Sequence, residues 1–137
     1  MTTITAARAT IYQEYFDNAA AITVATDLTF ENEEYDKPVA TPWVRLSMRH
    51  FGGGQESLGD VGSRKFNREG SVFVQVFIPQ DQGLSAADII AQEAREIFEG
   101  KTLSGIRLFT AEIREVGLTD GYHLILVEIG FEYTETR

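Results

Sequence analysis

Apolar and polar residues alternate most clearly in the stretch that begins at Trp43. One face of this stretch is apolar and the other polar, with Val44, Leu46 and Met48 opposed to Arg45, Ser47 and Arg49. Side chains two residues apart share a face of a strand, so the pattern predicts a strand with one buried and one solvated face.

A second segment, 71–78, is apolar on both faces. One side holds Val72, Val74, Val76 and Ile78, and the other holds Phe73 and Phe77, which flank Gln75. This pattern predicts a central strand with a helix on one side and a protein layer on the other. Two interpretations of Phe73 and Phe77 stay open: they belong to the core, or they meet a neighbouring subunit.

Two segments have helical spacing. Residues 4–20 repeat apolar positions every three or four residues, at Ile4, Ala7, Ile11, Tyr15 and Ala19. A second helix is predicted after Pro79 and the turn QDQG, with Ser85 as its N-cap and Gly100 as its C-terminal glycine. Its predicted core positions are Ile89, Ile90, Ala94, Ile97 and Phe98.

The rest of the chain completes one sheet. Residues 22–30 alternate weakly, which predicts one short strand or an extended crossing. The acidic segment 31–42 holds two prolines and is predicted to be a loop. Residues 106–133 predict two strands joined by GLTDG, because Asp120-Gly121 is a strong hairpin signal. The sum is an α+β domain, with a single mostly antiparallel β-sheet and two main helices packed on it.

A glycine-rich polar segment, 52–70, lies between two of the predicted strands, and we expect it to be a long flexible loop. Five of the chain's 12 basic residues lie in or just before it, and Phe66 sits among them. We interpret this cluster as a protein interface for other copies of the chain or for an acidic partner. The alternative is a set of solvated charges. The candidate interface residues are Arg45, Arg49, Arg64, Lys65, Phe66 and Arg68.

Composition narrows the classes of function. The chain has 137 residues, which predicts one domain over 1–137, and a net charge of −9, which argues against nucleic-acid recognition. It has no cysteine, no apolar run long enough to span a membrane and no signal-peptide core at its start. We therefore expect a protein made in the cytosol that does not bind membranes.

Candidate chemistry is sparse. His50 and His123 have no metal-ligand spacing, and the acidic run Glu31–Asp36 lacks the register of a calcium loop. The triple glycine at 52–54 precedes no helix, so it does not match a phosphate-binding loop. No serine has the surroundings of a nucleophile. We expect no metal, no cofactor and no enzymatic activity.

The order of features matches a known group. Thr41-Pro42-Trp43-Val44-Arg45-Leu46 enters a strand after the N-terminal helix, and Arg68-Glu69-Gly70 precedes the apolar strand that ends at Pro79. Gly83 precedes the second helix, and Asp120-Gly121-Tyr122 opens the last strand, which ends Phe131-Glu132-Tyr133. In this order, over residues 5–133, the chain resembles the small tail terminator-like and tail completion proteins of long-tailed phages with non-contractile tails.

The resemblance implies a structural virion protein. It would assemble as a homohexameric ring on the head-proximal end of the tail tube, with the tube protein and the head connector as partners. It would occur in the virion tail, and in the host cytoplasm during assembly. The 52–70 segment would face the tube or a neighbouring subunit. Alternatives are a head–tail adaptor or neck completion protein, or, in a different class, a small cytosolic ligand-binding α+β domain.

Overall fold

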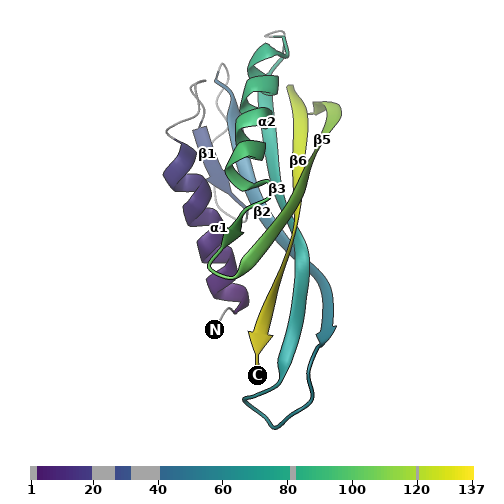
Figure 1. The fold of residues 1–137 in the computed structure, drawn as a ribbon. Helices are drawn as coiled ribbons and strands as arrows, with labels where there is room; N and C mark the ends of the chain where they lie inside the picture. The colour runs from purple at the N-terminus through teal and green to yellow at the C-terminus, as the bar shows by residue number, and fades with distance from the viewer. Residues whose placement is uncertain (1–2, 20–26, 32–40, 81–82, 120) are drawn as a thin grey trace.

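The computed structural model describes residues 3–19, 27–31, 41–80, 83–119 and 121–137. Within these ranges the chain forms two helices and one six-stranded sheet (Figure 1). The helices are α1 (Ile4–Ala19) and α2 (Ser85–Phe98). The strands are β1 (Asp27–Phe30), β2 (Trp43–Gln55), β3 (Lys65–Pro79), β4 (Thr102–Leu103), β5 (Ile106–Thr119) and β6 (Tyr122–Thr136).

The strand order in the sheet is β1-β2-β3-β6-β5-β4. β1 pairs with β2 in parallel, and the other four pairings are antiparallel. The predicted α+β class is therefore confirmed, but the sheet is mixed, and this corrects the expectation of a mostly antiparallel one. Two strands that are consecutive in the chain can be antiparallel when a tight hairpin joins them, whereas a parallel pair needs a long connection. A long connection separates β1 from β2 and allows their parallel pairing.

The core lies between the two helices and one face of the sheet, here named the helix face. The predicted alternation places Val44, Val76 and Ile125 in one cross-strand row, and Leu46, Val74 and Val127 in the next. All of these side chains are buried. Burying such rows under α1 and α2 supplies the main stabilisation of the fold, at about 25 cal/mol per Å² of apolar surface.

The helices match the sequence pattern with three corrections. Ala7, Ile11 and Tyr15 of α1 are buried as predicted, whereas Ile4 is exposed because α1 begins there. In α2 the N-cap position is Leu84 and not Ser85, and no side chain caps this end. Gly100 follows the helix with φ of 71°, as expected of a C-terminal glycine. Ile89 lies on the outer side of α2, since the buried face runs through Ala87, Ile90, Ala91, Ala94, Ile97 and Phe98.

The predicted loop over 52–70 is largely wrong. β2 continues to Gln55 and β3 begins at Lys65, so only residues 56–64 connect them. The glycines belong to a strand: Gly52, Gly53 and Gly54 pair with Glu69, Arg68 and Asn67. Gly53 has to be glycine, because its φ is 139° and a Cβ there would lie 1.8 Å from the carbonyl oxygen of Asn67.

The other face of the sheet, here named the open face, carries a small aromatic cluster of its own. Trp43 stacks on Phe77 with ring centroids 3.9 Å apart, and Leu124 and Tyr122 complete the group. Phe77 is therefore buried within this subunit, whereas Phe73 is only partly buried. The predicted hairpin at 117–121 is also confirmed, since Thr119 pairs with Tyr122. Ile22, Val24, Pro38 and Asp120 lie outside the described residues.

Candidate interaction surface

The largest feature outside the core is the long β2–β3 hairpin, which extends past both helices (Figure 1). We name its outer part, residues 51–70 together with the paired end of β6 at 131–136, the hairpin arm. β6 pairs with the β3 strand of the arm, from Lys65 opposite Thr136 to Gly70 opposite Phe131. A register shift between His50 and Gly52 marks where the arm leaves the body. The arm is thus a three-stranded extension of the sheet and not a loop.

A continuous stripe of aromatic and arginine side chains follows the arm on the helix face. The register sets it out in successive cross-strand pairs from the core to the tip: Gly70 with Phe131, Arg68 with Tyr133, and Phe66 with Glu135. His50 packs edge-on against Phe131 and Tyr133 at its inner end, with ring centroids 5.3 and 5.8 Å away. We name this set, with Arg64 at its outer end, the aromatic–arginine stripe.

In the outer part of the stripe, two guanidinium groups lie over one aromatic ring. The guanidinium carbons of Arg64 and Arg68 lie 5.6 and 5.2 Å from the centroid of Phe66. Arg68 also pairs with the buried carboxylate of Glu135 at 3.6 Å, and Arg137 pairs with the same carboxylate at 3.5 Å. Cation–π contacts of this kind contribute about 0.5–1 kcal/mol each at exposed sites. Phe66 is therefore a platform that holds the two guanidinium groups in place.

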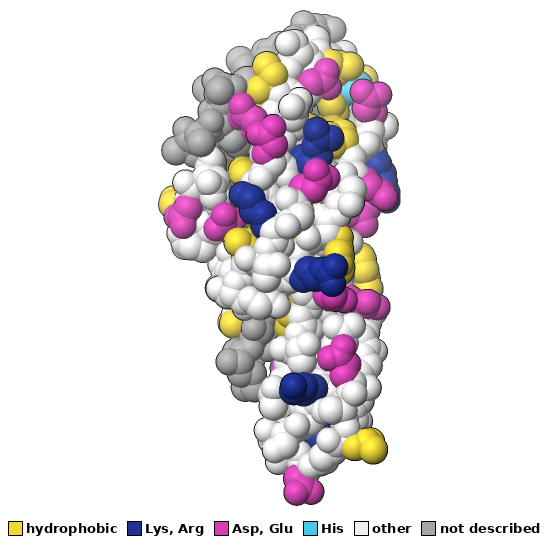
Figure 2. Space-filling view, in the orientation of Figure 1, with side chains coloured by type: hydrophobic (Ala, Val, Ile, Leu, Met, Phe, Trp, Pro, Cys, Tyr) yellow, Lys and Arg dark blue, Asp and Glu magenta, His cyan; other side chains and the backbone are white. Residues whose placement is uncertain are grey.

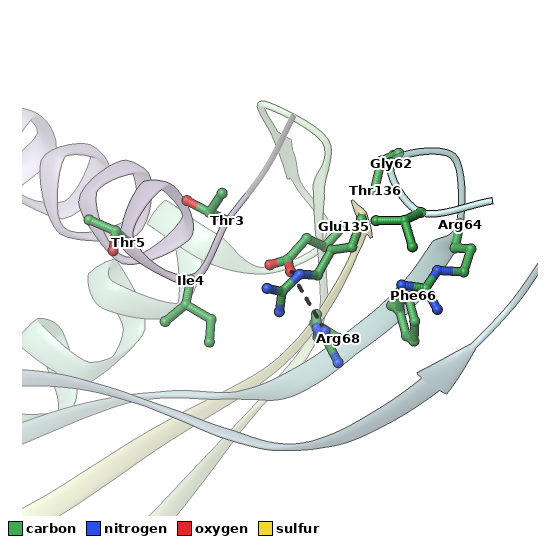
Figure 3. A pocket seen from close by; sticks show the side chains of 11 residues that line it. Thr3, Ile4, Thr5, Gly62, Arg64, Phe66, Arg68, Glu135 and Thr136 are labelled. Carbon is green, nitrogen blue, oxygen red and sulfur yellow. Dashed lines mark ion pairs between the residues drawn. The ribbon is translucent and has the colours of Figure 1, made fainter.

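An open cleft of about 780 Å³ lies between the stripe and the first turn of α1 (Figure 3). Figure 3 shows Thr3, Thr5 and Ile4 on one side and Arg64, Phe66, Arg68 and Glu135 on the other. Three arginines and one glutamate line it, so the cleft carries a local positive charge on a chain of net charge −9. The exposed apolar residues Leu58 and Val61 lie in the connection at the tip of the arm.

The inner end of the stripe holds a hydrogen bond between two titratable groups. His50 Nε2 and the Tyr133 hydroxyl are 2.8 Å apart. Burial lowers the pKa of His50, and the nearby charges of Arg8 and Arg68 lower it further, while Glu135 opposes them. Burial also raises the pKa of Tyr133, with Glu135 adding to the effect. The pair is therefore neutral at physiological pH and anchors the arm to the body.

The six candidate interface residues separate into different places. Arg64, Phe66 and Arg68 lie together in the stripe, whereas Lys65 points to the opposite side of the same strand because its neighbours in sequence occupy the stripe. Arg45 and Arg49 are on the open face, where Arg45 lies 5.2 Å from the Trp43 ring centroid and Arg49 donates to Glu31 at 2.8 Å. They border a depression of about 480 Å³ that also contains Phe73.

Sequence reasoning missed several residues of this surface. Glu135 and Arg137 come from the end of β6, and only the β3–β6 register brings them to Arg68. Leu58 and Val61 are 94% and 85% exposed, and they lie in a segment that the sequence pattern indicated to be a polar loop. The available signal was that two apolar residues occur in an otherwise polar connection.

Other chemistry is limited in the part of the chain that the structure describes. Its histidines, aspartates and glutamates form no group of three that could hold a metal ion. Neither of the described helices has the length and apolar character required to cross a bilayer. Acidic and basic side chains are interspersed on the face that carries α2, with an apolar side chain near the end of the arm (Figure 2).

Comparison with known proteins gives one family and one fold. The profile described as phage tail terminator protein matches residues 5–123. Among the solved structures that match, one superposes with a TM-score of 0.72 at 19% sequence identity, and covers 97% of this chain and 96% of that chain. At this identity the superposition shows a shared fold only. No curated protein sequence matches.

Proposed function

From the premise that this chain belongs to the phage tail terminator protein family, we propose that it forms a closed ring, with six copies as the expected number, that caps the head-proximal end of the tail tube. The ring ends tube growth and offers the surface to which the head connector joins. The family match over residues 5–123 is the observation that carries this proposal. It makes the chain a structural protein of a phage tail.

The distribution of charge and shape supports a ring. A subunit whose arm bears a positive cleft, while the whole chain carries −9, has unlike surfaces at different places. Two unlike surfaces form a heterologous, head-to-tail contact between neighbouring copies. Such contacts produce a closed ring when the repeated rotation from copy to copy returns to the first copy. We propose that the chain acts by assembly alone, without catalysis, in the host cytoplasm and then in the virion.

The test is a tube-capping experiment with the matching tail tube protein. Tubes are polymerised with and without the chain, and their lengths and ends are measured by electron microscopy. We expect shorter tubes with a ring at one end only, and light scattering is expected to give a ring mass for the capping species. Tubes of unchanged length with bare ends, together with a chain that stays monomeric on tubes, would overturn the proposal.

A head-joining assay separates the ring from an adaptor role. Capped tubes are mixed with connector-bearing heads, and joined particles are counted. We expect joining only for capped tubes. If the chain binds isolated heads but not tubes, the protein is an adaptor on the head side instead.

A further inference from the structure

We propose that the hairpin arm of one copy docks on the outer face of α2 of the next copy, with Arg64 facing the carboxylates of that helix. This inference rests on the ring proposed above and names the surfaces that build it. The occupant of the arm surface is thus a second copy of this chain.

Within the aromatic–arginine stripe, Arg64 is the guanidinium that pairs with no described carboxylate. Arg68 and Arg137 share the carboxylate of Glu135, but Arg64 has no carboxylate partner among the described residues. Its Nε is buried and makes no hydrogen bond there, while its guanidinium lies over Phe66. A guanidinium that no carboxylate of its own subunit pairs with can bind a carboxylate from outside the subunit.

The outer face of α2 offers the complementary chemistry. Positions 89, 92, 93 and 96 lie on one side of the helix because they follow its period. They line a shallow depression of about 250 Å³, which contains Ile89, Gln92, Glu93 and Glu96. Ile89 is an apolar side chain, 39% exposed, beside two carboxylates. The tip of the arm has a similar combination, because the exposed Val61 lines the same cleft as Arg64, and Leu58 is exposed in the same connection.

The two surfaces lie at different ends of one subunit. α2 covers the upper half of the sheet in Figure 1, and the arm extends from the lower end. An arm therefore reaches an α2 face on another copy, and each copy contributes one of each surface. Charge complementarity sets the partner and the register of such a contact, and apolar side chains at its centre add affinity.

A charge-swap experiment tests the contact. Arg64→Glu and Glu96→Lys are made singly and together, and assembly is followed by light scattering against protein concentration, with tubes present if the free chain is monomeric. We expect each single variant to raise the concentration for half-assembly about tenfold or more, and the double variant to recover most of that loss. Lys101→Glu is the control for Arg64→Glu, because it makes the same change of charge at an exposed site outside the proposed contact.

The outcomes separate this inference from the ring itself. Suppose that wild type assembles and caps tubes, and that both single variants assemble to the same extent as the Lys101→Glu control. The arm–α2 contact is then wrong, and the proposed ring is unaffected. If Arg64→Glu leaves assembly intact but abolishes tube capping, the arm binds the tube, which also overturns the contact. If wild type forms no ring even on tubes, the proposed function fails. Circular dichroism of each variant shows whether it is folded, and Arg64→Gln replaces any variant that is not.

Discussion

At the scale of single residues, Gly70 lies where the arm joins the body, and the packing there leaves no room for a side chain. A Cβ at this position would lie 2.0 Å from the carbonyl oxygen of Arg49 and 2.8 Å from the Phe131 ring. We expect Gly70→Ala to lower the free energy of unfolding by about 1–3 kcal/mol, since backbone and ring both have to shift. Urea denaturation measures this change.

Gly54→Ala is the matched control on the same arm. A Cβ at Gly54 meets nothing within 4 Å, and its φ does not require glycine. Its unfolding free energy is expected to stay within about 0.5 kcal/mol of wild type. Equal losses in the two variants would contradict the close approach described at Gly70.

The His50–Tyr133 pair makes stability depend on pH. The pKa of His50 is lowered from its ordinary value of 6.5, so the unfolded chain takes up a proton more readily than the folded one. The contribution of His50 is complete above pH 6.5 and is lost as pH falls from there through the lowered pKa. We expect wild type to lose more stability than His50→Gln between about pH 7.5 and about pH 5.5.

His123→Gln, at the other end of the sheet, is the control for this measurement. This variant makes the same substitution, histidine to glutamine, at a position away from Arg8 and Arg68. We expect its pH dependence to follow that of wild type when urea midpoints are compared at both pH values. A His50→Gln profile parallel to wild type would show that His50 does not carry the effect.

At the scale of elements, the sequence predicted what local patterns determine. Alternation identified β2 and β3 at their buried ends, and apolar spacing identified both helices. The outer part of β2 was not predicted because Gly52–Gln55 shows no alternation of apolar and polar residues, and its pairing with β3 is what makes it extended. Tertiary pairing overrides weak local preference in such segments.

The candidate site was predicted in part for a related reason. Arg64, Phe66 and Arg68 are close in sequence, and alternate positions of one strand place them on one face. Arg45 and Arg49 were grouped with them by sequence distance alone, yet they occupy the open face. Glu135 reaches Arg68 across 67 residues of chain, and no local pattern encodes that pairing.

Shortening the tip tests whether the arm's connection serves assembly and not folding. Replacing residues 57–63 by one glycine leaves Gly-Arg64 as a two-residue turn between Glu56 and Lys65, a form that hairpins favour. We expect the melting temperature to change by less than about 4 °C, because Leu58 and Val61 are exposed. Ring assembly is expected to weaken, because those two side chains are lost and Arg64 moves from its backbone pairing with Arg137 into the turn.

Leu58→Ser combined with Val61→Ser is the companion variant, since it removes the apolar side chains and keeps the length. The same loss of assembly in both variants would assign the effect to these side chains. A large drop in melting temperature in the shortened chain would instead show that the connection stabilises the fold. Differential scanning calorimetry and light scattering give the two readouts.

At the scale of the whole molecule, the charges predict a salt-sensitive assembly. Raising ionic strength from about 0.1 M to about 1 M shortens the Debye length from about 10 Å to about 3 Å. We expect the ring mass measured by light scattering to fall toward that of the monomer, because the arm and α2 carry opposite charges. Lowering the salt again restores the ring if the subunits stay folded. A mass unchanged by salt would mean that apolar contacts hold the ring.

The central position of β6 has a consequence for the order of folding during synthesis. β6 lies between β3 and β5, pairs with both, and follows every other strand in the chain. Before residues 122–136 have left the ribosome, the apolar strand β3 lacks one of its two neighbouring strands, and the arm lacks one of its three strands. Contacts between strands so far apart in sequence form slowly. A nascent subunit therefore has no complete arm until β6 has emerged from the ribosome, and in the ring proposed above the arm becomes available for docking only after that point.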